Sequence, residues 1–240
     1  MNDIEKLLIE KTQYGGNSNP NSKAISASEF GKDILQIYLR QKYGVIENES
    51  FSQNTIGSIC HIGIQELLKD KYMSEYDLEH KMSNGWSITG SIDLFNIKDR
   101  EFFDIKVTKS YTIEKVIKEP DHQYIWQLSV YRYLLEKHFG FDFNGYLLFV
   151  LKDGGFNFKS MRENPSIEIV NPHLKSNDEV EQKFYQIVDI LESSIEPEQC
   201  KDLWWRKTIN GSIPMRCSKY CSYNKYCKYF KNMNPMNINF

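Results

Sequence analysis

The sequence lacks a long hydrophobic run. No stretch of about 18 consecutive apolar residues, the length that a membrane-spanning helix needs, occurs among its 240 residues. The first residues, Met1 to Lys6, also lack the apolar centre of a secretory signal peptide. We therefore expect a cytoplasmic protein without a membrane partner.

The chain also lacks a strong excess of charge of either sign. Its formal net charge is −2, which excludes a uniformly basic surface of the histone-like kind. Nucleic acid is still a possible partner, because a local basic strip is enough to bind it. The apolar content of 40% and the charged content of 26% are ordinary for a globular protein. The length allows one large domain, or one domain with an appendage.

Cysteine is scarce, and its number is odd. Five cysteines occur, and three of them fall within eleven residues near the C-terminus. This arrangement is unlike a secreted disulfide framework, and in a cytosolic chain it favours a metal site. Cys60 lies on a predicted helix and is interpreted as a small buried apolar residue. The candidates for a metal site are Cys200, Cys217, Cys221 and Cys227.

Hydrophobic periodicity predicts an α/β fold. Helices are expected over residues 26–42, from about 55 onward, over 121–139 and over 178–194. Alternating patterns around the turn Asn84-Gly85 predict strands over 76–82 and 86–97, followed by strands over 101–108 and 145–151 and a short one near 166–170. We therefore expect a mixed, mainly antiparallel four-stranded sheet, beginning with a three-stranded meander and flanked by helices.

Composition divides the chain into four parts. Residues 1–24 form a turn-rich, flexible lead-in, and residues 25–195 form the core domain. Residues 196–231 form a helical, Cys-rich C-terminal appendage packed on the core. Residues 232–240 form an Asn-rich, disordered tail.

Two acids and a lysine occupy neighbouring predicted strands. Asp93 ends the run Gly90-Ser-Ile-Asp93, and Asp104 and Lys106 share one face of the next strand because strand side chains alternate. Two carboxylates suit Mg²⁺ or Mn²⁺, and such an ion can polarise a phosphoryl oxygen and lower the pKa of a bound water. Lys106 can position that water or neutralise developing charge. The pattern predicts metal-dependent phosphodiester chemistry.

Neighbouring segments supply further candidates. His61, on an upstream helix, would add a nitrogen ligand and shift the preference toward Mn²⁺. Gln127 and Tyr131 lie one helical turn apart on a later helix. Between the strand and that helix, lysines form either a solvated face or a phosphate-contacting strip, and two tyrosines could stack on bases. These residues are Lys109, Lys115, Lys118, Tyr111 and Tyr124.

In this order, the segments resemble the motifs of the PD-(D/E)XK nucleases, and more closely their RecB-like branch, which includes CRISPR adaptation nucleases and phage and recombination exonucleases. The motifs are His61, Gly90–Asp93, Asp104–Lys106 and Gln127–Tyr131, and the resemblance covers roughly residues 25–151. It implies a restriction-endonuclease-like core. The metal ligands that it implies are His61, Asp93, Asp104 and the backbone carbonyl of Ile105.

The resemblance also implies roles for the remaining site residues. Lys106 would be the catalytic lysine. Gln127 and Tyr131 would orient it and touch the DNA strand. Lys109, from the lysine strip rather than from the resemblance, is a further candidate DNA contact. Glu79 falls where some members of the branch carry an extra acid.

The implied function is hydrolysis of DNA with Mg²⁺ or Mn²⁺. An exonuclease acting on single strands or duplex ends is expected, in DNA recombination, repair or phage genome processing, within a bacterium or a phage-infected host cell. The sequence has no P-loop, so a helicase or recombination partner would be a separate chain. Three alternatives stay open: a structure-specific endonuclease, an RNA nuclease, and a non-catalytic DNA-binding or assembly subunit. The intact set of Asp93, Asp104 and Lys106 argues against the last.

The C-terminal cysteines resemble those of the iron–sulfur members of the branch, with one departure. Cys217-x3-Cys221-x5-Cys227 stands where the usual spacing is C-x2-C-x5-C. The fourth cysteine of those members belongs to an N-terminal segment that has none here, which leaves Cys200. Four thiolates could hold a [4Fe–4S] cluster or Zn²⁺, or the cysteines could pack without a metal. Either metal would pin the tail to the core and would not be the catalyst.

Overall fold

A computed structural model describes residues 22–44, 51–157, 162–193, 195–201, 203, 205–208 and 211–233. The expected lead-in and disordered tail lie almost entirely outside these residues. The chain divides into two compact units. The first comprises the described parts of Lys23–Gly31 and Ser50–Tyr185, and the second those of Lys32–Glu49 and Gln186–Phe240. The expected domain boundary after residue 195 stays a prediction.

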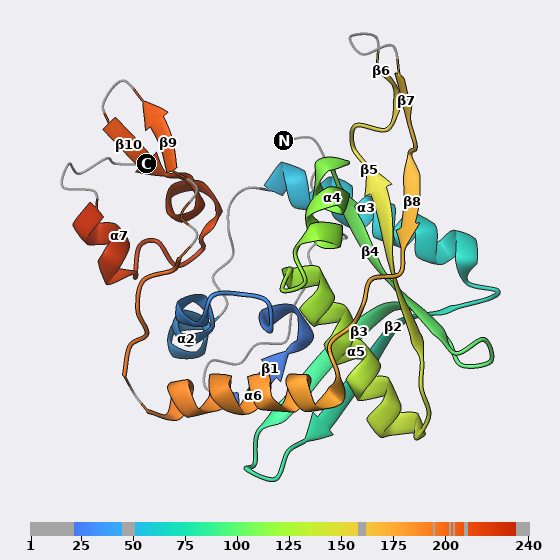
Figure 1. Cartoon of the computed structure of the whole chain (residues 1–240), viewed down its shortest axis with the longest axis horizontal. Helices are drawn as coiled ribbons and strands as arrows, with labels where there is room; N and C mark the ends of the chain where they lie inside the picture. The colour runs from blue at the N-terminus through green and yellow to red at the C-terminus, as the bar shows by residue number, and fades with distance from the viewer. Residues whose placement is uncertain are drawn as a thin grey trace, which may run out of the picture. The chain divides into compact units, whose positions relative to one another are not determined.

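Within its described residues, the first unit is built on a six-stranded sheet (Figure 1). Its strands lie in the order β1-β3-β4-β5-β8, and β2 pairs with β3. The β2–β3, β3–β4 and β5–β8 pairs are antiparallel, and the β1–β3 and β4–β5 pairs are parallel. The expected mixed, mainly antiparallel sheet is confirmed, although it has six strands in this part of the chain and not four. The strands are β1 (Ala24–Ser26), β2 (Met73–Lys81), β3 (Ser87–Asn96), β4 (Glu101–Thr108), β5 (Asn144–Leu151) and β8 (Ile167–Val170).

Helices cover both faces of this sheet. α3 (Phe51–Leu68) packs Ile64 and Leu68 on a cluster that includes Phe103. α5 (Gln123–Phe139) packs on the other face, where the rings of Tyr131 and Phe102 meet edge-on with centroids 6.5 Å apart. Phe102 and Phe103 face opposite helices because adjacent strand side chains alternate. No helix of the described residues is long and apolar enough to cross a membrane.

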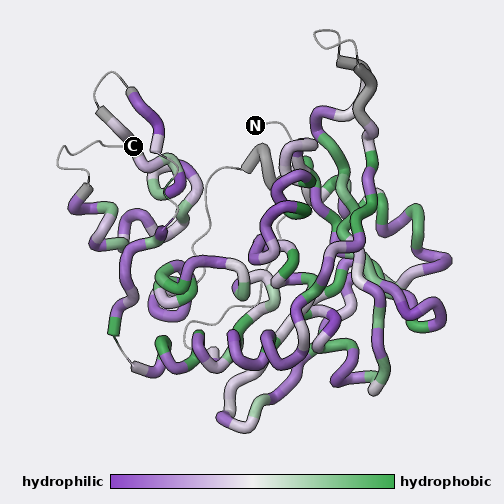
Figure 2. The backbone as a smooth tube through the Cα atoms, viewed as in Figure 1, coloured by the Kyte–Doolittle hydropathy of each residue, from purple (hydrophilic) through white to green (hydrophobic). Residues whose placement is uncertain are grey.

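Two further helices complete the connections. α4 (Tyr111–Lys118) buries Thr112, Ile113 and Val116, and the sequence analysis predicted no helix there. α6 (Asn177–Glu192) alternates hydrophilic and hydrophobic residues, as Figure 2 shows. The N–H of Ser176 donates to Glu179 at 2.7 Å, and the N–H of Glu179 donates to the Ser176 hydroxyl at 3.2 Å. This capping box fixes the start of α6 close to the predicted residue 178. A small hairpin joins β6 (Gly155–Asn157) to β7 (Arg162–Asn164).

The single helix predicted over residues 26–42 is wrong in its first part. Ala24–Ser26 is strand β1, a short 3-10 turn (Ala27–Glu29) follows, and α2 (Ile34–Tyr43) begins only after it. The N–H of Ser26 donates to the Glu29 carboxylate at 2.9 Å, so a local capping box replaces continued helix. Gly31 then passes Gln123 so closely that a Cβ at position 31 would lie 2.3 Å from the Gln123 Cα. Periodicity alone does not detect such a break.

β3 pairs with two different strands along one edge. Its start, Ser87–Thr89, pairs with β1, and its end, Leu94–Asn96, pairs with β4. β2 occupies the opposite edge along most of the strand. Among the described strands, residues 90–93 therefore have no ladder partner on the β1–β4 edge, and the sheet opens there.

The second unit is organised around α2. Leu35 and Leu39 of this helix pack against Cys227. Arg216 forms an ion pair with Asp33 at 2.6 Å, which ties the C-terminal residues to the start of the helix. The expected helical appendage is only partly helical. It contains the antiparallel hairpin of β9 (Trp205–Thr208) and β10 (Gly211–Pro214), a π-helical turn (Arg216–Tyr220) and α7 (Lys228–Met233).

Candidate active site

Asp93 and Asp104 lie where β3 and β4 separate. Leu94 pairs with Phe103 in the antiparallel register, so the two aspartates would form the next pair, but the ladder ends before them. Instead, the N–H of Ile105 donates to Oδ2 of Asp93 at 2.6 Å. The Asp93 side chain thus takes the place of a strand partner for this backbone N–H. Asp93 is 8% exposed and Asp104 is 1% exposed. The separating strands thus hold two buried acids.

A chain of polar contacts runs from Asp104 to α5. Nζ of Lys106 lies 2.9 Å from Oδ1 and 2.7 Å from Oδ2 of Asp104. It also donates to Oε1 of Gln127 at 3.1 Å, and Nε2 of Gln127 donates to the Tyr131 hydroxyl at 2.8 Å. Asp104 and Lys106 share a strand face, and Gln127 and Tyr131 share a helix face. The structure therefore brings these four predicted residues together.

Gly90 makes room for Tyr131. A Cβ at position 90 would lie 2.8 Å from Cε1 of Tyr131 and 3.1 Å from Cδ1 of Leu134. Contacts this short are closer than carbon atoms pack, so a side chain at position 90 would displace the ring. Tyr131 is 5% exposed. Its burial supports a role in positioning Gln127, and its expected contact with DNA stays a prediction.

His61 reaches the site from α3. Its Nδ1 lies 3.6 Å from Oδ2 of Asp93. This nitrogen is buried and has no hydrogen-bond partner within the described part of the chain. Burial, and then the positive charge of Lys106, lower the pKa of His61, which favours the neutral form that binds metals.

The site holds two acids and one basic side chain, and burial makes the charged form of the acids costly. Burial, and then the charge of Asp104, raise the pKa of Asp93 to about 8. For Lys106, burial lowers the pKa, but the charges of Asp104 and Asp93 outweigh it and the net shift is upward. Lys106 therefore stays an ammonium. Two acids beside one ammonium in a buried place favour an added cation.

The donor set fits a hard divalent metal ion. Asp93, Asp104 and the Ile105 carbonyl supply oxygens, and the buried Nδ1 of His61 is a nitrogen donor without another partner in the described structure. As the side chains stand, no three His, Cys, Asp or Glu of the described residues are arranged to hold an ion. The ammonium of Lys106 contacts both oxygens of Asp104. Metal binding would require Lys106 to release at least one of them.

Glu75 and Gln65 lie beside the site and were missed by the sequence analysis. Glu75 lies between the pairs Ser74–Leu94 and Tyr76–Ile92 of the β2–β3 register, which puts it level with Asp93, and its φ of 51° is in the left-handed region. Nε2 of Gln65, on α3, donates to Oε1 of Glu75 at 2.6 Å and to the Asp93 carbonyl at 3.3 Å. After burial and Asp104, the charge of Glu75 also raises the pKa of Asp93. The turn Asn84-Gly85 sets the register and is the sequence signal that could have found Glu75.

The extra acid suggested by the resemblance, Glu79, makes a different contact. Its Oε1 accepts a hydrogen bond from the Ser87 hydroxyl at 2.6 Å. In the β2–β3 register Glu79 stands opposite Thr89, four residues before Asp93 along β3. Glu75 is therefore the acid of β2 that lies nearest in register to the site.

Tyr124 is a third residue whose place the sequence did not predict. Nζ of Lys106 lies 4.9 Å from the centroid of its ring, within cation–π range. Tyr124, Gln127 and Tyr131 follow one another at helical spacing along one face of α5. Tyr124 therefore extends the face that holds Lys106. Lys109 is exposed just after β4 and lies outside this chain of contacts.

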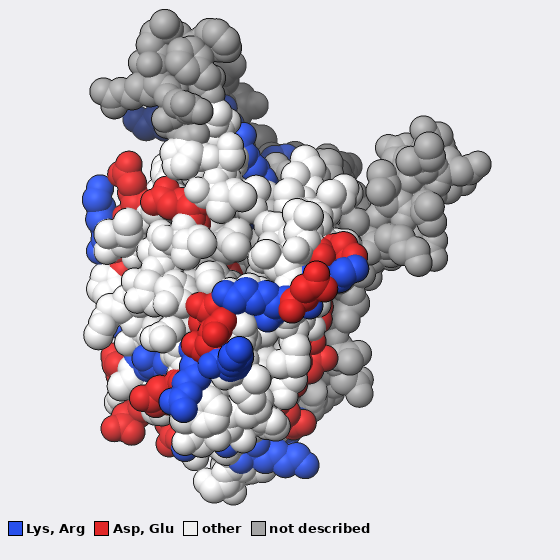
Figure 3. Space-filling model, turned by 90° about the vertical axis from the view of Figure 1, so that its right-hand side faces the viewer, with Lys and Arg blue, Asp and Glu red and all other residues white. Residues whose placement is uncertain are grey.

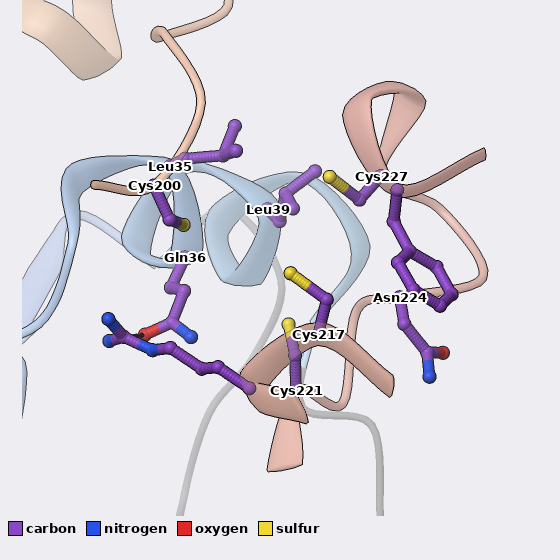
Figure 4. A pocket seen from close by; sticks show the side chains of 10 residues that line it. Leu35, Gln36, Leu39, Cys200, Cys217, Cys221, Asn224 and Cys227 are labelled. Atoms are coloured by element: carbon purple, nitrogen blue, oxygen red, sulfur yellow. Dashed lines mark hydrogen bonds between the residues drawn. The ribbon is translucent and has the colours of Figure 1, made fainter. Parts of the chain in front are cut away.

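The four candidate cysteines line one pocket of the second unit (Figure 4). Leu35, Gln36 and Leu39 of α2 line the same pocket. Burial, with contributions from neighbouring thiols, raises the pKa of Cys200 to about 12 and that of Cys217 to about 11. Four thiols in one pocket fit a cluster or zinc as a donor set, although no three of them are arranged to hold an ion in the described structure. Cys60, which was expected to be buried, is partly exposed on α3.

A mixed sheet that opens at two buried acids, with a lysine two residues beyond the second, defines a PD-(D/E)XK-type core. Residues 57–204 match the family model described as "PDDEXK-like domain of unknown function (DUF3799)". The chain belongs to this family. Both the motif resemblance and the expected restriction-endonuclease-like fold class are confirmed. No curated protein matches the sequence.

Solved structures are similar to this one. The crystal structure of SSO0001 matches with a TM-score of 0.61 at 16% identity, over 95% of this chain and 98% of that one. An alkaline exonuclease, LHK-Exo from Laribacter hongkongensis, gives a TM-score of 0.48 at 14% identity, over 73% and 91%. A phage-related exonuclease from Haemophilus somnus 129PT gives 0.42 at 15% identity, over 67% and 78%. Sequence identities this low show a similarity of fold only. The match to SSO0001, with a TM-score of 0.61, is the one that supports the fold.

Proposed function

We propose that this protein is a metal-dependent nuclease that hydrolyses DNA phosphodiester bonds. The observation that carries the proposal is the pair of buried acids Asp93 and Asp104, with the half-buried Lys106 beside them, at the opening between β3 and β4. Burying two carboxyl groups and most of an ammonium costs folding free energy, so their retention here favours a functional reason. Membership of the PDDEXK-like family supports the same chemistry.

In this proposal, His61, Asp93, Asp104 and the Ile105 carbonyl hold Mg²⁺ or Mn²⁺. When bound, the ion supplies a Lewis acid for the scissile phosphate and lowers the pKa of a water molecule.

Lys106 supplies positive charge where the phosphate oxygens become more negative. Its ammonium has three N–H groups and contacts both oxygens of Asp104 and Oε1 of Gln127, so releasing one Asp104 oxygen to a metal would free one N–H. That N–H would then be available to a phosphate oxygen. Gln127 holds Lys106 in place because the buried Tyr131 in turn holds Gln127.

The finer proposal is an exonuclease that acts on single strands or duplex ends in recombination, repair or phage genome processing. Its setting would be the cytoplasm of a bacterium or of a phage-infected host cell. A helicase or recombination protein would be a separate partner chain. The motif resemblance supports this choice over a structure-specific endonuclease, and the complete acid and lysine set supports an active enzyme over a non-catalytic subunit.

The test is digestion of end-labelled single-stranded DNA, duplex DNA and RNA, beside a closed circular single strand, with Mg²⁺ or Mn²⁺ and with EDTA. We expect metal-dependent loss of the linear DNA substrates and survival of the circle. Cleavage of the circle would favour the endonuclease, and preference for RNA would contradict the DNA assignment.

Substitutions make this test specific to the site. Asp104→Ala and Lys106→Ala should abolish cleavage, and Gln127→Ala should slow it less severely because it acts through Lys106. The matched control is Asp77→Ala, which removes an exposed acid of the same sheet and should cleave normally. Wild-type activity in Asp104→Ala or Lys106→Ala would overturn the proposal.

We also propose that Cys200, Cys217, Cys221 and Cys227 hold a structural [4Fe–4S] cluster or Zn²⁺. Their convergence on one pocket supports this proposal. Anaerobically purified protein should contain either iron and sulfide with visible absorbance, or zinc in a colourless sample. Cys217→Ser should lose the metal and melt at a lower temperature, whereas Cys60→Ser, which lies in the first unit, should keep it. Metal-free protein whose melting is unchanged by Cys217→Ser would leave the cysteines as packing residues.

A further inference from the structure

The charge of the C-terminal stretch differs from that of the rest of the chain. We refer to residues 201–231 as the basic segment. It holds eight of the chain's 30 Lys and Arg residues and one of its 32 Asp and Glu residues. Its formal charge is therefore +7, in a protein whose net charge is −2. The cations are Lys201, Arg206, Lys207, Arg216, Lys219, Lys225, Lys228 and Lys231.

These cations are at the surface. Arg216 is partly buried against Asp33, and the other seven are exposed. The face drawn in Figure 3 is different, because acidic and basic side chains are interspersed on it. In the first unit, for example, Lys71 lies 3.3 Å from carboxylate oxygens of both Asp99 and Glu101. In the basic segment, Lys228 lies 3.5 Å from Glu196 and Arg216 pairs with Asp33, but the sequence of the segment itself supplies one acid for eight cations.

Exposed aromatic rings accompany the cations. Trp205 is 57% exposed, Tyr220 58% and Tyr226 45%. Tyr226 packs against Tyr43 with ring centroids 4.6 Å apart, so the rings whose surface positions need a reason are chiefly those of Trp205 and Tyr220. In β9, residues two apart point to the same face of the hairpin, which places Trp205 and Lys207 side by side.

We propose that the basic segment is a binding surface for single-stranded nucleic acid. A strand offers phosphates to the lysines and arginines, and its unpaired bases offer flat faces to the tryptophan and tyrosines. A duplex offers the same phosphates but hides its base faces within the stack. The proposed binding surface depends on the charge and the exposed rings of the basic segment, so it can be tested independently of the proposed cleavage activity.

The experiment measures binding without catalysis. The full chain is titrated into a fluorescein-labelled 20-nucleotide oligothymidylate in EDTA, and anisotropy is followed at several salt concentrations. Arg206→Gln/Lys207→Gln should weaken binding and make the slope of log K against log salt shallower by about 1.4, since each contacted phosphate of a single strand contributes about 0.7. The matched control, Lys81→Gln/Lys98→Gln, removes two exposed lysines of the first unit and should leave both quantities unchanged.

Three further measurements protect the result from a folding artefact. Lys225→Gln/Lys231→Gln lies outside the hairpin and should weaken binding in the same way. Trp205→Ala should lose about tenfold in affinity, as expected for one stacked base, and Trp205→Phe should keep most of it. Far-UV circular dichroism should not change in any variant. Wild-type affinity and slope in both charge variants would overturn the proposal, and equal competition by an unlabelled 20-base-pair duplex would overturn its single-strand preference.

Discussion

Replacing Gly90 by alanine tests whether the space beside Tyr131 is needed for the active arrangement. The added Cβ would lie 2.8 Å and 3.0 Å from Cε1 and Cδ1 of Tyr131, and 3.1 Å from Leu134. Tyr131 and Leu134 are buried at 5% and 2% exposure, so neither can move freely out of the way. We expect Gly90→Ala to displace the Tyr131 ring and weaken its hydrogen bond with Gln127.

Two opposing effects set the change in the free energy of unfolding caused by Gly90→Ala. Overpacking a well-packed core costs about 1–3 kcal/mol, whereas glycine in a strand interior is destabilising by about 0.5–1 kcal/mol relative to alanine. The overpacking term is larger, and the net loss should be about 0.5–2 kcal/mol. For a chain of this size, that corresponds to a melting temperature lower by about 1–8 °C. Cleavage should fall further than stability explains, because Gln127 and then Lys106 lose their support.

The assays are thermal unfolding and initial cleavage rate at saturating metal. Gly63→Ala is the control, and it should change stability in the opposite direction. Position 63 lies on α3, and an added Cβ there would meet no atom within 4 Å beyond the helix backbone around it. Gly63→Ala should raise stability by up to about 1 kcal/mol. In a Tyr131→Leu background, Gly90→Ala should cost less than in the wild type, since the ring is gone. If Gly90→Ala melts and cleaves like the wild type, Tyr131 does not depend on this space and the reasoning is refuted.

Two further predictions concern the residues beside the site. Tyr124→Leu should slow cleavage about threefold, from loss of a cation–π contact with Lys106 of about 0.5–1 kcal/mol, while Tyr124→Phe keeps the ring and the rate. Equal rates in the two variants would show that the ring does not hold Lys106. Glu75→Gln should raise the Mg²⁺ concentration for half-maximal cleavage about fivefold, which corresponds to about 1 kcal/mol for an exposed charge near the ion. The amide oxygen can still accept from Gln65, so melting should be unchanged, and an unaltered metal requirement would place Glu75 outside the site's electrostatics.

Local signals predicted the central strands well. The expected strand 101–108 matches β4 (Glu101–Thr108), and the expected hairpin at Asn84-Gly85 joins β2 and β3. Alternation identifies such strands because each has one face toward α3 and the other toward α5. The same alternation put Asp104 and Lys106 on one face, and helical spacing put Gln127 and Tyr131 on another.

Contacts between distant segments could not be predicted in this way. β1 is a three-residue strand whose only signal is its parallel pairing with Ser87–Thr89, more than sixty residues later. The turn Asn84-Gly85 gives the register that brings Glu75 near Asp93, but no sequence signal predicts the positive φ of Glu75. The cysteines were visible as a spacing, but their common pocket depends on α2, which belongs to the other end of the chain.

The contact between Lys106 and Asp104 explains why the site needs α5. In the absence of metal, both oxygens of Asp104 contact the ammonium of Lys106, so Asp104 supplies most of its anchor and the helix residues add to it. A divalent ion that takes one of those oxygens would repel the ammonium and remove part of its anchor. Gln127 and Tyr124 contact the ammonium from the helix side, and so they can keep it beside the phosphate after that exchange. On this argument, the helix residues matter most when metal is bound, and their substitutions should slow cleavage more than they lower the stability of the metal-free protein.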